Sequence, residues 1–184
     1  MFNNPKARRI WLKIRYPLAF VFLLFMPQFM QPDLLLPAFL VSLMGELIQV
    51  WSFASLVKNE ELTIRGPYVL VRNPMYLGRY LIGLGFIILF NQLWLIILYT
   101  VVYVLYMVNR VKREEKLLTE LLPAYADYSR RVHRFLPTLG VSDSHPLVYF
   151  SWATLRMNHG DRNFYVFLLI YLGLALYFYF FKHI

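Results

Sequence analysis

Residues able to bind a small charged ligand are concentrated in two polar segments between apolar stretches. The first segment ends in Val71-Arg72-Asn73-Pro74. Pro74 restricts Asn73 to an extended conformation and suits the first turn of a helix. Asn73 can therefore cap that helix, and the free backbone N–H groups of the helix would attract an anion. A helix cap that binds no ligand is the alternative interpretation.

The second segment, residues 109–137, carries two adjacent acids, Glu114 and Glu115. Neighbouring residues differ by about 100° around a helix, so the two carboxylates cannot face one site equally. The pattern predicts that one faces a cavity while the other pairs with an arginine or lysine one turn away. A solvated charged helix end has the same composition.

Aromatic and basic residues follow at helical spacing. Tyr125 and Tyr128 are expected on one helix face, as are Arg131 and Arg134. The same residues are also typical of an interfacial strip without a ligand. His133 is a candidate base by residue type alone, and we interpret it as a surface or packing residue.

Apolar helices are expected to position these segments. Hydrophobic residues make up 59% of the 184 positions, charged residues make up 16%, and the mean hydropathy is +0.50. Soluble domains are nearer half apolar and a quarter charged, so the surplus is expected to face lipid. The chain has no cysteine, which excludes disulfides, a thiolate metal site and a cysteine nucleophile. We expect no metal site.

The apolar runs predict an all-α, polytopic membrane protein with about five transmembrane helices. The predicted spans are residues 16–30, 34–56, 76–90, 93–108 and 164–181, of which the third and fourth form a helical hairpin. No small-residue cleavage site follows the first apolar run, so a signal peptide is not expected. We expect one domain, 1–184, with a motif-bearing core at 60–140. The remainder, 141–184, is expected to hold an interfacial segment and the last span.

Basic residues are asymmetric about these spans. If the N-terminus is cytoplasmic, Lys182 alone among the 19 lysines and arginines lies on the opposite side. The positive-inside rule requires such an asymmetry, and it accounts for the net charge of +9 without nucleic acid as a partner. We therefore predict a multi-pass protein of a bacterial inner membrane or the endoplasmic reticulum. Its predicted partners are the bilayer and a lipophilic substrate, and the oligomeric state stays open.

The ordered motifs resemble one family, the isoprenylcysteine carboxyl methyltransferases, and the related phospholipid methyltransferases. The motifs are Gly-Pro-Tyr-x-x-Val-Arg-Asn-Pro-x-Tyr-x-Gly at 66–78, the hairpin, Glu-Glu-x-x-Leu at 114–118, Tyr-x-x-Tyr at 125–128 and Arg-Phe-Leu-Pro at 134–137. The resemblance covers residues 60–140, and its specificity lies in the ordered set.

This resemblance implies an all-helical membrane enzyme that transfers a methyl group from S-adenosylmethionine to an isoprenylcysteine-like carboxylate or a lipid head group. The matching positions imply these cofactor-binding residues: Tyr68, Val71, Arg72, Asn73, Pro74, Tyr76, Gly78, Glu114, Glu115, Tyr125 and Tyr128. The catalytic residue is not identified, and the candidates are Arg72, Glu115 and Arg134.

Several alternatives stay open. Asn73 stands where the family usually has histidine, so the sequence does not decide between O- and N-methylation. An NADPH-dependent membrane reductase of the sterol type and a non-enzymatic lipid-binding protein are the competing functions. Glu46 and Gln49 in the second span predict either an inter-helix hydrogen-bond network or a substrate contact. Gly83 and Gly85 predict close helix packing.

Overall fold

The computed structural model describes residues 13–14, 17, 25–57, 62–138 and 146–182, and every regular element in these ranges is helical. The predicted all-α fold class is therefore confirmed for the described residues. Three are 3-10 helices: η1 (Met26–Phe29), η2 (Pro32–Leu34) and η3 (Gly66–Val69). The α-helices are α2 (Leu35–Ser55), α3 (Pro74–Ile88), α4 (Leu93–Leu121), α5 (Tyr125–Arg131), α6 (Trp152–Met157) and α7 (Gly160–Phe181).

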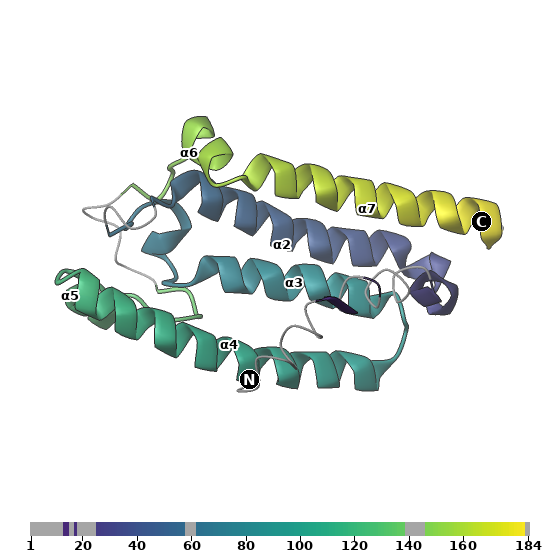
Figure 1. The fold of residues 1–184 in the computed structure, drawn as a ribbon, viewed down its shortest axis with the longest axis horizontal. Helices are drawn as coiled ribbons and strands as arrows, with labels where there is room; N and C mark the ends of the chain where they lie inside the picture. The colour runs from purple at the N-terminus through teal and green to yellow at the C-terminus, as the bar shows by residue number, and fades with distance from the viewer. Residues whose placement is uncertain (1–12, 15–16, 18–24, 58–61, 139–145, 183–184) are drawn as a thin grey trace.

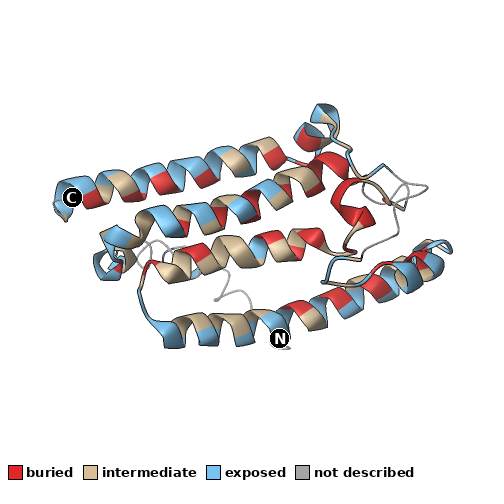
Figure 2. Cartoon of the chain, turned by 180° about the vertical axis from the view of Figure 1, so that it is seen from behind, coloured by how far each residue is buried: buried red, intermediate tan, exposed pale blue. Residues whose placement is uncertain are grey.

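The four long helices lie side by side in the order α7, α2, α3 and α4 (Figure 1). The short elements η3, α5 and α6 are grouped at the end of the bundle where α2 ends and α3 begins. All residues of η3 are buried, as are the adjoining ends of α2 and α3 (Figure 2). This end of the bundle therefore holds the polar segments in a packed environment.

Small residues allow α2 and α3 to approach closely. A Cβ atom built on Gly45 would lie 2.5 Å from the backbone oxygen of Gly78, and one built on Gly85 would lie 2.5 Å from the backbone oxygen of Ala38. Gly83 instead faces Tyr99 of α4. The predicted close packing at Gly83 and Gly85 is confirmed, since a side chain at either position would overlap a neighbouring helix.

Three described helices are long and apolar enough to cross a membrane: Pro32–Ser55, Leu93–Leu121 and Gly160–Phe181. The helix Pro74–Ile88 is apolar but shorter. The predicted number of five spans is therefore not confirmed. The first predicted span, 16–30, lies largely outside the described residues, and only its end appears, as η1.

The helix α4 is longer than a bilayer core. Its 29 residues extend about 44 Å, whereas the hydrocarbon core is about 30 Å thick. The helix runs without a break from the fourth predicted span, 93–108, to Leu121, so that the span and the two glutamates lie on one helix. Its last turns, which carry Glu114 and Glu115, therefore lie outside the hydrocarbon region when the apolar part spans it.

Glu46 and Gln49 are buried within α2 at 2% and 7% exposure. The Gln49 amide donates a hydrogen bond to Glu46 Oε2 at 3.5 Å, and Gln49 Cγ lies close to Gly78 of α3. Glu46 Oε1 has no hydrogen-bond partner in the described part of the chain. The hydrogen bond between them is within α2, so the predicted inter-helix network is not seen in the described residues, and both side chains are packed inside the helix bundle.

Candidate active site

Glu115 is the centre of a buried charge cluster. Its Oε1 accepts a hydrogen bond from Asn73 Nδ2 at 3.3 Å and lies 3.2 Å from Arg72 Nη1. Its Oε2 accepts hydrogen bonds from Nε and Nη2 of Arg134, the first at 3.0 Å. Both carboxylate oxygens are thus occupied, which makes the ionised form of a side chain at 7% exposure tolerable. Two guanidinium groups against one carboxylate leave one positive charge uncompensated within the cluster.

Backbone pairing brings Arg134 to this cluster. The helix α5 ends at Arg131, so Arg134 does not share a helix face with it, contrary to the spacing argument. Instead the Arg72 N–H donates to the carbonyl oxygen of His133 at 3.0 Å, and the Thr138 N–H donates to that of Leu70 at 2.8 Å. The two loop segments therefore run beside each other. The hydrogen bonds from its guanidinium to Glu115 raise the pKa of Arg134.

His133 is exposed, as the sequence interpretation predicted. His133 contributes to the structure through its backbone. Its N–H donates to Thr138 Oγ1 at 2.8 Å, and its carbonyl oxygen accepts a hydrogen bond from the Arg72 N–H.

Glu114 has different partners from its neighbour. The Tyr76 hydroxyl donates to Glu114 Oε2 at 2.8 Å. Arg110 Nε donates both to Tyr76 Oη at 2.9 Å and to Glu114 Oε1 at 3.0 Å. The pairing with Arg110, one turn earlier in α4, follows the predicted pattern for one of the two adjacent acids.

Asn73 occupies the N-cap position of α3, but its side chain makes no capping hydrogen bond. The predicted cap is therefore wrong, because the Asn73 amide donates to Glu115 instead. Pro74 is at the start of the helix as predicted.

Three tyrosines form an aromatic wall beside the cluster. Tyr125 and Tyr128 of α5 are in edge-to-face contact with ring centroids 5.9 Å apart, and Tyr128 donates a hydrogen bond to the Tyr68 carbonyl at 2.7 Å. Burial raises the pKa of Tyr125 to about 12 and also raises the pKa of Tyr68 and of Tyr128. These phenols therefore stay protonated at neutral pH and act as hydrogen-bond donors, not as bases.

A cavity of about 380 Å³ lies between this wall and the end of α4. Its volume is near the lower end of the usual range for small-molecule sites, about 300–1,000 Å³. It is lined by apolar residues together with a few polar ones: Leu56, Val57, Leu62, Thr63, Tyr68, Arg72, Glu114, Leu117, Leu118, Leu122, Tyr125 and Tyr128. This mixture fits a ligand with both an apolar or aromatic part and charged groups.

Two of the lining residues carry buried polar atoms without a partner in the described residues, Tyr68 Oη and Arg72 Nε. A buried donor without an acceptor costs roughly 1–3 kcal/mol, so such groups are usually satisfied by a ligand or water. Both residues line the cavity, whereas these two atoms are themselves shielded from solvent. The Arg72 guanidinium gives the lining a cation, with which an anionic group of a ligand can pair.

Residues 38–124 match the profile of a known family, the phospholipid methyltransferases. Over this segment, which is slightly less than half of the chain, the protein is similar to the phospholipid methyltransferases. The three helices long enough to cross a bilayer, taken with this match, support a membrane protein.

Two curated proteins to which this chain is similar are metal-resistance proteins. A nickel-cobalt-cadmium resistance protein of Alcaligenes xylosoxydans xylosoxydans is 25% identical over 111 residues, 59% of this chain and 51% of that protein. A cobalt-zinc-cadmium resistance protein of Cupriavidus metallidurans is 30% identical over 84 residues, 46% of this chain and 39% of that protein. The matched segments span about half or less of these relatives. No solved structure matches.

The family motif residues fall into three groups in the structure. Tyr68, Arg72, Glu114, Tyr125 and Tyr128 line the cavity. Tyr76 and Glu115 contact two of those side chains, Glu114 and Arg72 respectively. Asn73 and Arg134 in turn bind Glu115.

The third group lies outside the cavity lining and has structural roles. Val71 is buried at 5% exposure, and Pro74 begins α3. Gly78 allows helix contact, because a Cβ there would lie 2.7 Å from both Gln49 Cγ and the Gly45 oxygen. Burial, helix initiation and close helix contact thus account for these three motif residues.

The apolar lining is the part that motif reasoning missed. Leu117, Leu118 and Leu122 come from the end of α4 and the residue after it, and Leu56 and Val57 follow α2. The signal available in the sequence was the leucine repeat that follows the two glutamates, which continues the helix with an apolar face.

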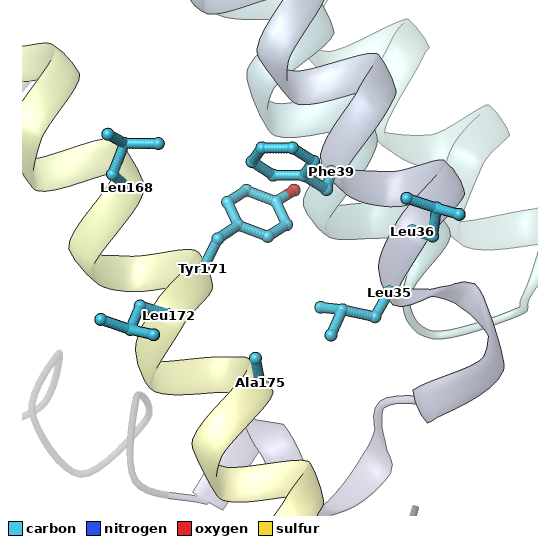
Figure 3. Close-up of a pocket in the computed structure, with 7 residues that line it drawn as sticks. All are labelled: Leu35, Leu36, Phe39, Leu168, Tyr171, Leu172 and Ala175. Carbon is cyan, nitrogen blue, oxygen red and sulfur yellow. The ribbon is translucent and has the colours of Figure 1, made fainter.

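A second cavity, of about 310 Å³, lies between α2 and α7 and is lined almost wholly by apolar side chains (Figure 3). Its polar atom is the Tyr171 hydroxyl, which already bonds to Ser42 Oγ at 2.6 Å and to the Ala38 carbonyl at 3.1 Å. This cavity therefore suits a hydrocarbon chain and not the polar cofactor that the family motif implies.

Proposed function

We propose that the protein is an S-adenosylmethionine-dependent methyltransferase that acts on a lipophilic acceptor. The family match supports methyl transfer at a membrane. The observation that carries the choice of methyl donor is the presence of two unpartnered buried donors, Tyr68 Oη and Arg72 Nε, in residues that line the same cavity as the Glu114 carboxylate. S-Adenosylmethionine carries groups complementary to each of them.

Each part of that ligand has a suitable partner in the cavity. Arg72 and the Tyr68 hydroxyl would bind its carboxylate, which is the anionic group that both atoms need. Glu114 would accept hydrogen bonds from its ammonium or its ribose hydroxyls. The tyrosine rings would face its sulfonium cation, a cation–π contact that contributes about 0.5–2 kcal/mol. Glu115, whose oxygens are all engaged, would hold Arg72 in place instead of touching the ligand.

The donor supplies an electrophilic methyl group and leaves as a neutral thioether. The residues of this chain therefore need to orient the two reactants and exclude water, and no acid is needed for the leaving group. The leucines of the cavity wall would exclude water, and the protonated tyrosines would not compete as nucleophiles.

The acceptor is a carboxylate, amine or hydroxyl on a lipophilic molecule. A carboxylate needs no base, whereas an ammonium must lose a proton before it can attack. Among the described residues that line the cavity, Glu114 is the one carboxylate that can take up that proton. Arg110 Nε, 3.0 Å from Glu114 Oε1, would hold that carboxylate in position.

Calorimetric titration of the detergent-purified protein with S-adenosylhomocysteine tests the proposal. We expect binding by the wild-type protein and about tenfold or more weaker binding by Tyr68→Phe, the loss expected for a hydrogen bond to a charged group. The thermal stability of Tyr68→Phe should be unchanged, because its hydroxyl has no partner in the described structure.

Tyr165→Phe, which removes an exposed hydroxyl from α7, is the matched control and should bind as the wild type does. Absence of binding to folded wild-type protein would contradict the methyl donor. Thermal protection by NADPH in its place would favour the reductase alternative.

A further inference from the structure

Four exposed aromatic or apolar residues lie around α6, in residues 146–162, which we call the elbow. Val148 is 94% exposed, Trp152 68% and Met157 61%, and the Phe150 ring stacks edge-to-face on Trp152 at 4.9 Å. The segment is not part of the methyl-transfer cavity, since none of its residues lines it. It is an apolar surface of a kind that normally needs a partner.

The elbow is held rigidly on the bundle. Asn158 Nδ2 donates to the carbonyl oxygens of Phe53 and Leu56, at 2.9 and 2.7 Å, and so satisfies the last turn of α2. Leu155, at 2% exposure, packs against Phe53. The Ser151 side chain accepts a hydrogen bond from the Thr154 N–H at the start of α6. The exposed side chains are therefore presented on a fixed scaffold.

A second set of contacts ties the beginning of the elbow to α2 and to the start of η3. Gly66 N–H donates to the Pro146 carbonyl at 3.0 Å, and Trp51 Nε1 donates to the Tyr149 carbonyl at 3.1 Å. The Arg65 guanidinium lies over the Tyr149 ring at 4.4 Å. Tyr149 is thus engaged with the protein, which leaves Trp152 and its neighbours as the outward face.

Two arginines accompany these apolar residues. Arg156 near the end of α6 and Arg162 in the first turn of α7 are exposed, and neither guanidinium has an ion pair or hydrogen bond within the described ranges. Asp161, the one acid in the elbow, is only partly exposed, and its Oδ1 is buried. The outward surface therefore presents cations next to aromatic and apolar side chains.

The elbow also lies where a membrane surface is expected. The helix α7, one of the three long enough to span a bilayer, begins at Gly160, immediately after the turn of the elbow. Figure 1 shows α6 at the same end of the bundle as α5, beside the first turn of α7. Aromatic residues at this depth favour the head-group layer, and arginines there pair with lipid phosphates.

We propose that the elbow is a binding surface for anionic phospholipid head groups. Trp152 and Met157 enter the interfacial layer, and Arg156 and Arg162 bind the phosphates of lipids that carry a net negative charge. Charge complementarity selects anionic over zwitterionic lipid, since each unpaired arginine adds to the attraction. This inference does not depend on the proposed methyl transfer, because the elbow and the cavity share no residue.

Titration of the full-length protein in detergent with short-chain phosphatidylglycerol, and separately with phosphatidylcholine, tests the proposal. The readout is the apparent affinity from the rise in unfolding temperature. We expect the wild type to prefer phosphatidylglycerol. Arg156→Gln/Arg162→Gln should lose about fivefold of that preference per arginine, on the order of 25-fold in all. Arg156→Lys/Arg162→Lys should keep most of it, which separates the role of charge from a structural role.

Lys112→Gln/Arg113→Gln is the matched control, because it removes the same charge from exposed positions on α4. It should retain the preference for phosphatidylglycerol. Equal losses in the two double variants would show diffuse surface charge and overturn the proposal. So would a wild type without the preference, or an undiminished preference in Arg156→Gln/Arg162→Gln, which would point to a protein partner for the elbow. All variants are compared after circular dichroism has shown equal helix content.

Discussion

Glu115→Gln is expected to destabilise the protein by about 3 kcal/mol, because it leaves two arginines next to a neutral side chain in a buried cluster. Arg72 and Arg134 would then repel each other without the carboxylate between them. Since Arg72 also lines the cavity, its displacement should weaken binding of S-adenosylhomocysteine. Thermal unfolding in detergent and calorimetric titration measure the two effects.

Glu120→Gln is the control for this substitution, because Glu120 lies on the same helix and is exposed. It should change neither stability nor binding by a measurable amount. A Glu115→Gln protein with wild-type stability would show that the cluster is not a closed ion-pair network. Normal stability with lost binding would instead assign Glu115 to the ligand directly, as the family resemblance implied.

Gly45→Ala is expected to have the second large effect, a loss of about 1–3 kcal/mol in the free energy of unfolding. The added methyl group would lie 2.5 Å from the Gly78 oxygen and 2.8 Å from the Ile82 nitrogen. Both are backbone atoms, so the overlap can be relieved only if α2 and α3 separate. The measurement is thermal or denaturant-induced unfolding in detergent.

Gly173→Ala gives the matched comparison with the opposite sign. Nothing lies within 4 Å of a Cβ at Gly173 in α7, so alanine should stabilise the helix by up to about 1 kcal/mol. Equal effects of the two substitutions would mean that helix propensity, and not the α2–α3 contact, decides stability.

The separation of α2 from α3 in Gly45→Ala should also weaken ligand binding, because Asn73 and Arg72 directly precede α3.

Local patterns in the sequence were enough to predict the helical fold, the α3–α4 hairpin and the long helix that carries both glutamates. Each of these depends on interactions between residues close in sequence, such as the apolar run of α4 and the polar break at Asn91. Glycine packing at Gly83 and Gly85 was predictable for the same reason, because glycine has few other uses inside an apolar helix. The motifs also singled out Arg72 and the three tyrosines that line the cavity in the structure.

Only the tertiary structure decided how these residues divide the work. The Asn73 amide donates a hydrogen bond to Glu115 at 3.3 Å, although the two residues are 42 positions apart in the sequence. Arg134 reaches the same cluster because its loop is joined by backbone hydrogen bonds to the loop that holds Arg72. A rule based on spacing along one helix cannot predict such a contact. The two glutamates also differ in role for a tertiary reason. The orientation of each carboxylate depends on the helix or loop that packs against its side of α4. The sequence by itself thus determined the elements and their chemical content, whereas long-range packing and charge pairing determined which side chains face the cavity and which hold it together.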